Sequence, residues 1–97
     1  MPQVFERAKP TEVFYGQTEI IGSATVIGTS QDLVACEMTV KAMAGNNNSI
    51  WVGDSSVALA TGFELKAGQQ ITVTVGSPDQ LYAIATSTPD DVSWIAT

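Results

Sequence analysis

The sequence predicts an all-β fold, an antiparallel β-sandwich or jelly-roll-like barrel of about seven strands with an extended N-terminal arm. Three observations lead to this prediction. Apolar and polar residues alternate over several short stretches, turn-forming residues recur between them at intervals of roughly 8 to 12 residues, and no interval holds a helix of ordinary length. The 97 residues suit a single core. We expect residues 17–97 to form the sandwich and residues 1–16 to form an arm or edge segment.

The first sixteen residues lack a long alternating run, contain two prolines and hold half of the four cations. They fit either a loose terminus with an edge strand around residues 13–15 or an arm that binds a partner. The aromatic content of the segment makes its larger apolar side chains candidates for partner contact, namely Val4, Phe5, Phe14 and Tyr15.

Residues 18–28 are apolar but interrupted by Gly22, which predicts a strand bent at that glycine. From residue 33 to 43 the apolar residues fall on alternate positions, and a helix would split this set between two faces. Residues 50–52 and 62–65 are two further short strands between turn-forming segments.

The clearest strand spans residues 70–75, where three β-branched apolar residues alternate with a glutamine and two threonines. Residues 81–86 and 91–96 are predicted to form the last strands. The turns between these segments contain Gly, Pro, Asn and Asp, at residues 45–48, 66–68, 76–79 and 88–90.

Composition excludes several classes of partner. Ten acidic and four basic residues give a net charge of −6, which repels nucleic acid and anionic membrane surfaces. The four cations are too scattered to follow a phosphate backbone, at Arg7, Lys9, Lys41 and Lys66. We also predict neither a signal peptide nor a membrane-spanning segment.

The residues that usually carry out catalysis are scarce. The chain has no histidine and one cysteine, which excludes Ser-His-Asp and Cys-His nucleophiles, and Cys36 falls on the apolar side of its strand. The acids Asp54, Asp79, Asp90 and Asp91 lie in or beside predicted turns, where aspartate bonds local backbone amides. We therefore expect no enzymatic activity and no cofactor.

Two groups of residues in the sequence could form a binding site for a metal ion or a sugar. Asn46, Asn47, Asn48 and Asp54 could offer oxygen ligands to calcium, but their spacing matches no EF-hand, and turn chemistry explains them better. The aromatic residues Trp51, Phe63, Tyr82 and Trp94 could form a platform for sugars or could fill the core or a subunit contact. Trp51 and Trp94 are accordingly candidate partner-binding residues.

Five segments carry a resemblance to known proteins: Cys-Glu-Met-Thr-Val-Lys-Ala at 36–42, Ser-Ile-Trp-Val-Gly at 49–53, Gly-Phe-Glu-Leu-Lys-Ala-Gly-Gln at 62–69, Leu-Tyr-Ala-Ile-Ala at 81–85 and Val-Ser-Trp at 92–94. In their order and spacing they resemble small β-sandwich structural proteins of tailed bacteriophages. The resemblance covers about residues 34–95 and implies a virion protein, without binding residues that could be carried over onto the arm.

Among virion positions, the expectation is a capsid decoration or cement protein without enzymatic activity. It would stabilise the shell by bridging subunits of the major capsid protein, as a homo-oligomeric trimer or dimer. It would be made in the host cytoplasm and lie on the capsid surface of the virion. The alternative is a receptor- or carbohydrate-binding module on a tail or fibre, using Trp51 or Trp94. A third class, an enzyme subunit or metal-binding domain, has no supporting residues.

Overall fold

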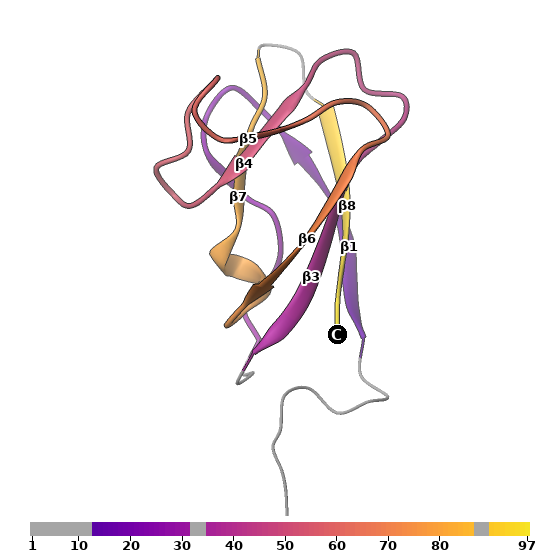
Figure 1. Ribbon diagram of the computed structural model, residues 1–97, viewed down its shortest axis with the longest axis vertical. Coiled ribbons are helices and arrows are strands. Elements are labelled where there is room, and N and C mark those ends of the chain that lie inside the picture. Colours follow the sequence, from indigo (N-terminus) through magenta and orange to yellow (C-terminus); the bar gives the residue numbers. More distant parts are fainter. Residues whose placement is uncertain (1–12, 32–34, 87–89) are drawn as a thin grey trace, which may run out of the picture.

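The computed structural model describes residues 13–31, 35–86 and 90–97, and these residues form eight strands and one short 3₁₀ helix (Figure 1). The elements are β1 (Phe14–Ile20), β2 (Thr25–Val26), β3 (Cys36–Ala42), β4 (Ile50–Gly53), β5 (Phe63–Leu65), β6 (Gln70–Val75), η1 (Pro78–Gln80), β7 (Tyr82–Ile84) and β8 (Asp90–Ala96). The prediction of an all-β fold is confirmed.

The strands form two four-stranded sheets, which lie on opposite sides of the molecule in Figure 1. Sheet A has the order β1-β8-β3-β6 and sheet B the order β2-β7-β4-β5, with every pair antiparallel. The first strand therefore pairs with the last, the second with the seventh, the third with the sixth and the fourth with the fifth. This nesting is the strand order of a jelly roll.

Two expected boundaries differ in an informative way. The strand expected over residues 18–28 is two strands, because β1 ends at Ile20 in sheet A and β2 begins at Thr25 in sheet B. The chain crosses between the sheets at Gly22, where a Cβ atom would lie 2.8 Å from the carbonyl oxygen of Thr86. The boundary expected at residue 16 between the arm or edge segment and the sandwich falls inside β1, and Phe14 and Tyr15 belong to this edge strand, as the edge-strand interpretation of residues 13–15 predicts.

The core lies between the sheets and follows from the alternation in the central strands. In β3, Cys36, Met38, Val40 and Ala42 are buried while Glu37 and Lys41 are exposed. β8 repeats the pattern. The remaining core residues come from β1 and β8 of the same sheet, from strands of sheet B and from the residues that follow β2 and β7, and they include Ile20, Ile27, Ile50, Val52, Leu65, Ala83, Ala85, Val92, Trp94 and Ala96.

Candidate functional site

The outer face of sheet A carries an exposed apolar cluster, which we call the Tyr15 patch and define as Val13, Tyr15 and Ile95. Tyr15 lies directly opposite Ile95 in the β1–β8 pair. Their exposed fractions are 76% for Tyr15, 45% for Ile95 and 44% for Val13. Val13 immediately precedes β1 and lies two residues before Tyr15, the spacing at which side chains of extended backbone point to the same side. Such contiguous exposed apolar side chains are typical of protein-binding surfaces.

The patch continues across the sheet as a row of hydroxyl groups. Ile95 lies opposite Thr39 of β3, and Thr39 lies opposite Thr72 of β6. The two hydroxyl oxygens are 2.7 Å apart and share a hydrogen bond. A shallow depression of about 190 Å³ lies beside this row, lined by Thr39, Lys41, Gln70, Ser93, Trp94 and Ile95. The middle of sheet A is therefore a polar surface with a shallow depression that a partner could cover.

One end of the same face is acidic. Glu19 lies opposite Asp91 in the β1–β8 pair, and both side chains are exposed. Like charges at directly opposite positions repel each other, so this pair favours a cationic partner group. The backbone of Asp91 is fixed by Asn46, whose Oδ1 accepts from the Asp91 N–H at 2.9 Å and whose Nδ2 donates to the Asp91 carbonyl at 2.9 Å. The amide group of the Asn46 side chain thus makes the two hydrogen bonds to Asp91 that the backbone of a neighbouring strand would otherwise make.

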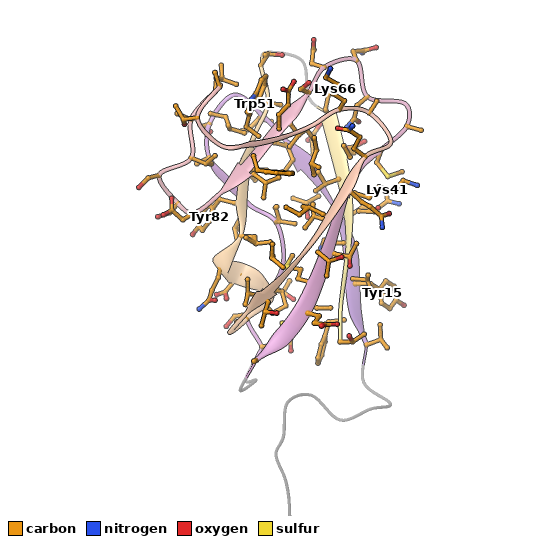
Figure 2. All side chains as sticks on the ribbon, viewed as in Figure 1. Tyr15, Lys41, Trp51, Lys66 and Tyr82 are labelled. Atoms are coloured by element: carbon orange, nitrogen blue, oxygen red, sulfur yellow. The ribbon has the colours of Figure 1, made fainter. Side chains whose placement is uncertain are left out.

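The outer face of sheet B presents a second, smaller aromatic surface. Trp51 lies between Ile84 and Glu64, and Tyr82 lies between Val26 and Gly53. Ile84 is buried but does not belong to the core cluster between the sheets, because it points to the outer side beside Trp51. Figure 2 shows Trp51 and Tyr82 on one side of the molecule and Tyr15 and Lys41 on the other.

The predicted partner-binding residues fall into four different environments. Tyr15 is exposed on the outer face of sheet A, and Phe14 is half-buried against the core. Trp51 is half-buried on sheet B. Trp94 is 6% exposed and belongs to the core, so its ring is not a stacking surface. Val4 and Phe5 lie outside the described residues.

Sequence reasoning missed Ile95 as part of this surface. The alternation of residues 91–96 assigns Asp91, Ser93 and Ile95 to the outward side, so Ile95 is an apolar residue at a position where polar residues are usual. An apolar residue at an outward position was therefore the sequence feature that could have identified Ile95 as part of the exposed surface. Its pairing with Tyr15, however, depends on the register between β1 and β8, which are the most distant strands in sequence.

Three of the four residues considered as calcium ligands, Asn46, Asn47 and Asp54, make hydrogen bonds within the fold. Asp54 Oδ1 accepts a hydrogen bond from the Ser56 N–H at 2.9 Å, which closes a turn. Asp90 is 3% exposed, and its Oδ1 accepts from the Asn47 N–H at 3.0 Å. Its Oδ2 has no hydrogen-bond partner. Among the described residues, no three His, Cys, Asp or Glu side chains converge as metal ligands would.

Three depressions on the described surface each contain one ionisable side chain. The depression on sheet A contains only Lys41 as an ionisable group, a second of about 590 Å³ near β5 contains only Glu64, and a third of about 220 Å³ beside the asparagine turn contains only Lys66. General acid–base chemistry requires groups that act in concert within one site. None of these three depressions offers such a set.

The described part of the chain contains no helix of the length and apolarity needed to cross a membrane. Comparisons with protein-family models, curated proteins and solved structures found no match.

Proposed function

We propose that this protein is a non-enzymatic structural protein of a tailed bacteriophage virion, most specifically a capsid decoration protein that bridges subunits of the major capsid protein. The observation that carries the binding role is the Tyr15 patch, with an exposed tyrosine directly opposite an exposed isoleucine on the outer face of sheet A. The assignment to a virion rests on the sequence resemblance over about residues 34–95. Tyrosine is enriched at protein interfaces because it combines a large apolar ring with a polar tip.

Three further properties support the proposal. The jelly-roll order occurs in viral structural proteins, although it also occurs in lectins and therefore does not fix the function. Each of the three depressions considered contains one ionisable group, which favours binding over catalysis. The net charge of −6 keeps the free protein soluble before assembly and favours a partner surface that presents cations to Glu19 and Asp91.

The patch also lies where residues 1–12 join the domain, because Val13 immediately precedes β1. In this proposal, the arm and the outer face of sheet A contact neighbouring capsid subunits together. Two linked contacts give a higher apparent affinity than either contact alone, since the second forms within one complex.

The test is co-sedimentation of the purified protein with capsids assembled from the major capsid protein of the same phage, without other virion proteins. We expect saturable binding with a fixed ratio of protein to capsid subunits, and greater resistance of decorated capsids to heat. Binding to unassembled capsid subunits alone, or no binding to either form, would contradict the proposal.

A second candidate function rests on Trp51. Its half-buried ring lies beside Glu64, whose Oε2 accepts a hydrogen bond from the Ser49 hydroxyl at 2.6 Å. An aromatic face with polar neighbours suits a sugar, which supports a receptor- or carbohydrate-binding module on a tail or fibre. Glycan binding that Trp51→Ala abolishes, together with indifference to capsids, would favour this candidate.

A further inference from the structure

Strand β6 forms one edge of sheet A and lacks the features that usually protect an edge. Its sequence, Gln-Ile-Thr-Val-Thr-Val, contains no charge, no proline and no glycine. The other edges are protected: β2 has two residues, β5 has three including Glu64, and β1 contains Gly16 and Glu19. A long, uncharged edge with β-branched residues is a template for pairing with another strand.

The backbone of β6 is available for such pairing at alternate residues. Glu37 lies opposite Thr74, but both backbone groups of Glu37 bond Thr97, the residue after β8, at 3.1 Å for its N–H and 3.0 Å for its carbonyl. Glu37 and Thr74 are therefore a non-hydrogen-bonded pair, and the backbone groups of Thr74 point away from β3. Because the two kinds of pair alternate along an antiparallel ladder, the same holds for Thr72 and Gln70.

The side chains along this edge are also incompletely covered. Ile71, Val73 and Val75 point toward the core but are only half-buried. Phe63 of β5 lies opposite the buried Val52, yet it is 56% exposed, because the sandwich is open between its β5 and β6 edges. Apolar side chains at this opening would gain burial from an added strand.

The charges around β6 indicate what the added strand is. Lys41 lies opposite Gln70, Lys66 lies in the turn that precedes Gln70, and Glu37 lies opposite Thr74. One end of the strand is thus flanked by the two described lysines and the other by a glutamate. In antiparallel pairing of two copies, Lys41 of each chain lies across the two β6 strands from Glu37 of the other, three strand spacings or about 14 Å away, so the two ends attract weakly and do not repel. The uncharged strand lets two acidic chains meet without direct repulsion.

We propose that two copies of this chain form a dimer by antiparallel pairing of β6 with β6, with Thr72 opposite Thr72 of the second copy. This register pairs residues that point to the same side of the sheet, and it places Gln70 opposite Thr74. All backbone groups that hydrogen-bond across the axis then belong to Gln70, Thr72 and Thr74, the residues whose groups are available. The two sheets A become one continuous sheet of eight strands.

The same register accounts for two other features. The hydroxyl row of Thr39 and Thr72 continues across the axis into Thr72 and Thr39 of the second copy. The residues after Thr74 of the second copy run beside Gln69 and Gly68, which line the depression of about 590 Å³ next to Phe63. That segment fills the depression and covers the exposed phenyl ring. The dimer requires no capsid, so its test is separate from that of the proposed function.

The first experiment is sedimentation velocity of the full chain over a range of concentrations, without any partner. We expect a reversible monomer–dimer equilibrium for the natural sequence. Thr72→Lys places two lysines opposite each other with Cα atoms about 5.5 Å apart across the axis, and their like charges weaken the dimer by on the order of tenfold or more. Thr39→Lys is the matched control, because it removes the same hydroxyl pair but keeps the two lysine Cα atoms about 14 Å apart. A dimer unaffected by Thr72→Lys, or a monomer at every concentration, overturns the proposal.

A second experiment tests the register with a short thiol-to-thiol crosslinker. Thr72→Cys brings two thiols together at the axis and should give a covalent dimer in high yield. Thr74→Cys is the control, because its two thiols lie about 13 Å apart along the paired strands. Cys36 is buried and does not compete for the reagent. Equal crosslinking of both variants, or crosslinking of Thr74→Cys alone, overturns the register.

Discussion

Gly16 lies directly opposite Trp94 in the β1–β8 pair, and a Cβ atom on Gly16 would lie 3.1 Å from the indole Nε1. The indole of Trp94 is accommodated because its cross-strand neighbour has no side chain. This contact explains why the largest aromatic ring of β8 can lie in the core beside an edge strand.

Gly16→Val should destabilise the fold by about 1–3 kcal/mol, because the added atoms must displace a packed indole ring. Urea unfolding monitored by tryptophan fluorescence would measure the loss. Gly45→Ala is the control, since a Cβ atom at Gly45 meets nothing within 4 Å, and its effect should stay within about 0.5 kcal/mol. Equal stability of Gly16→Val and the natural protein would show that the ring can move at little cost.

Met38→Asp should prevent folding. Met38 is fully buried in the central strand β3, and a carboxylate there would be unpaired in the core at a cost of several kcal/mol. Circular dichroism during heating would measure the result. Thr39→Asp, one residue further along on the outward side, should keep a cooperative transition. A normal transition for Met38→Asp would refute the assignment of this face to the core.

Asn46→Ala should lower stability by about 1–2 kcal/mol, because it removes two hydrogen bonds that fix the backbone of Asp91. Chemical denaturation would measure the change. Asn48→Ala provides the comparison, since Asn48 is exposed in the same turn. A similar loss in both variants would mean that the turn as a whole, and not the Asn46 side chain, supports β8.

Tyr15→Ser should weaken capsid binding by about tenfold or more without unfolding the domain, because an exposed anchor ring is lost from the proposed contact surface. Quantitative co-sedimentation would measure the dissociation constant. Leu59→Ser is the control, since Leu59 is also exposed and apolar but lies in the segment between β4 and β5 of sheet B. Unchanged binding by Tyr15→Ser would argue against the outer face of sheet A.

Removing residues 1–10 should leave the melting temperature nearly unchanged but weaken capsid attachment, because the first strand begins only at Phe14. Thermal unfolding and co-sedimentation of the same preparation would separate the two effects. Equal attachment by the shortened protein would count against a contribution of the arm.

Most strands could be predicted because local alternation determines them. Residues 70–75 match β6 residue for residue, and the alternation around Met38 correctly identified the buried side of β3. The bend at Gly22 was also anticipated, but the change of sheet that it produces was not. Sheet membership depends on contacts between distant strands, which a local pattern does not contain.

The candidate site was less predictable for the same reason. Tyr15 was identified from composition, whereas Ile95 became relevant only through its register with Tyr15. Trp94 is a residue of the core whose burial the local sequence does not determine. A tryptophan at this position is compatible with core or surface, and its burial depends on the absence of a side chain at Gly16, a residue near the other end of the chain.

The position of β8 between β1 and β3 has a consequence for folding during synthesis. The pairs β4–β5 and β3–β6 join strands that are all translated before β7 and β8, so they can form while the chain is still growing. β1 is translated early but must wait for the last strand before it can pair. Sheet A therefore closes only after translation of the domain is complete, and until then both neighbours of the missing strand remain exposed to chaperones and to other nascent chains.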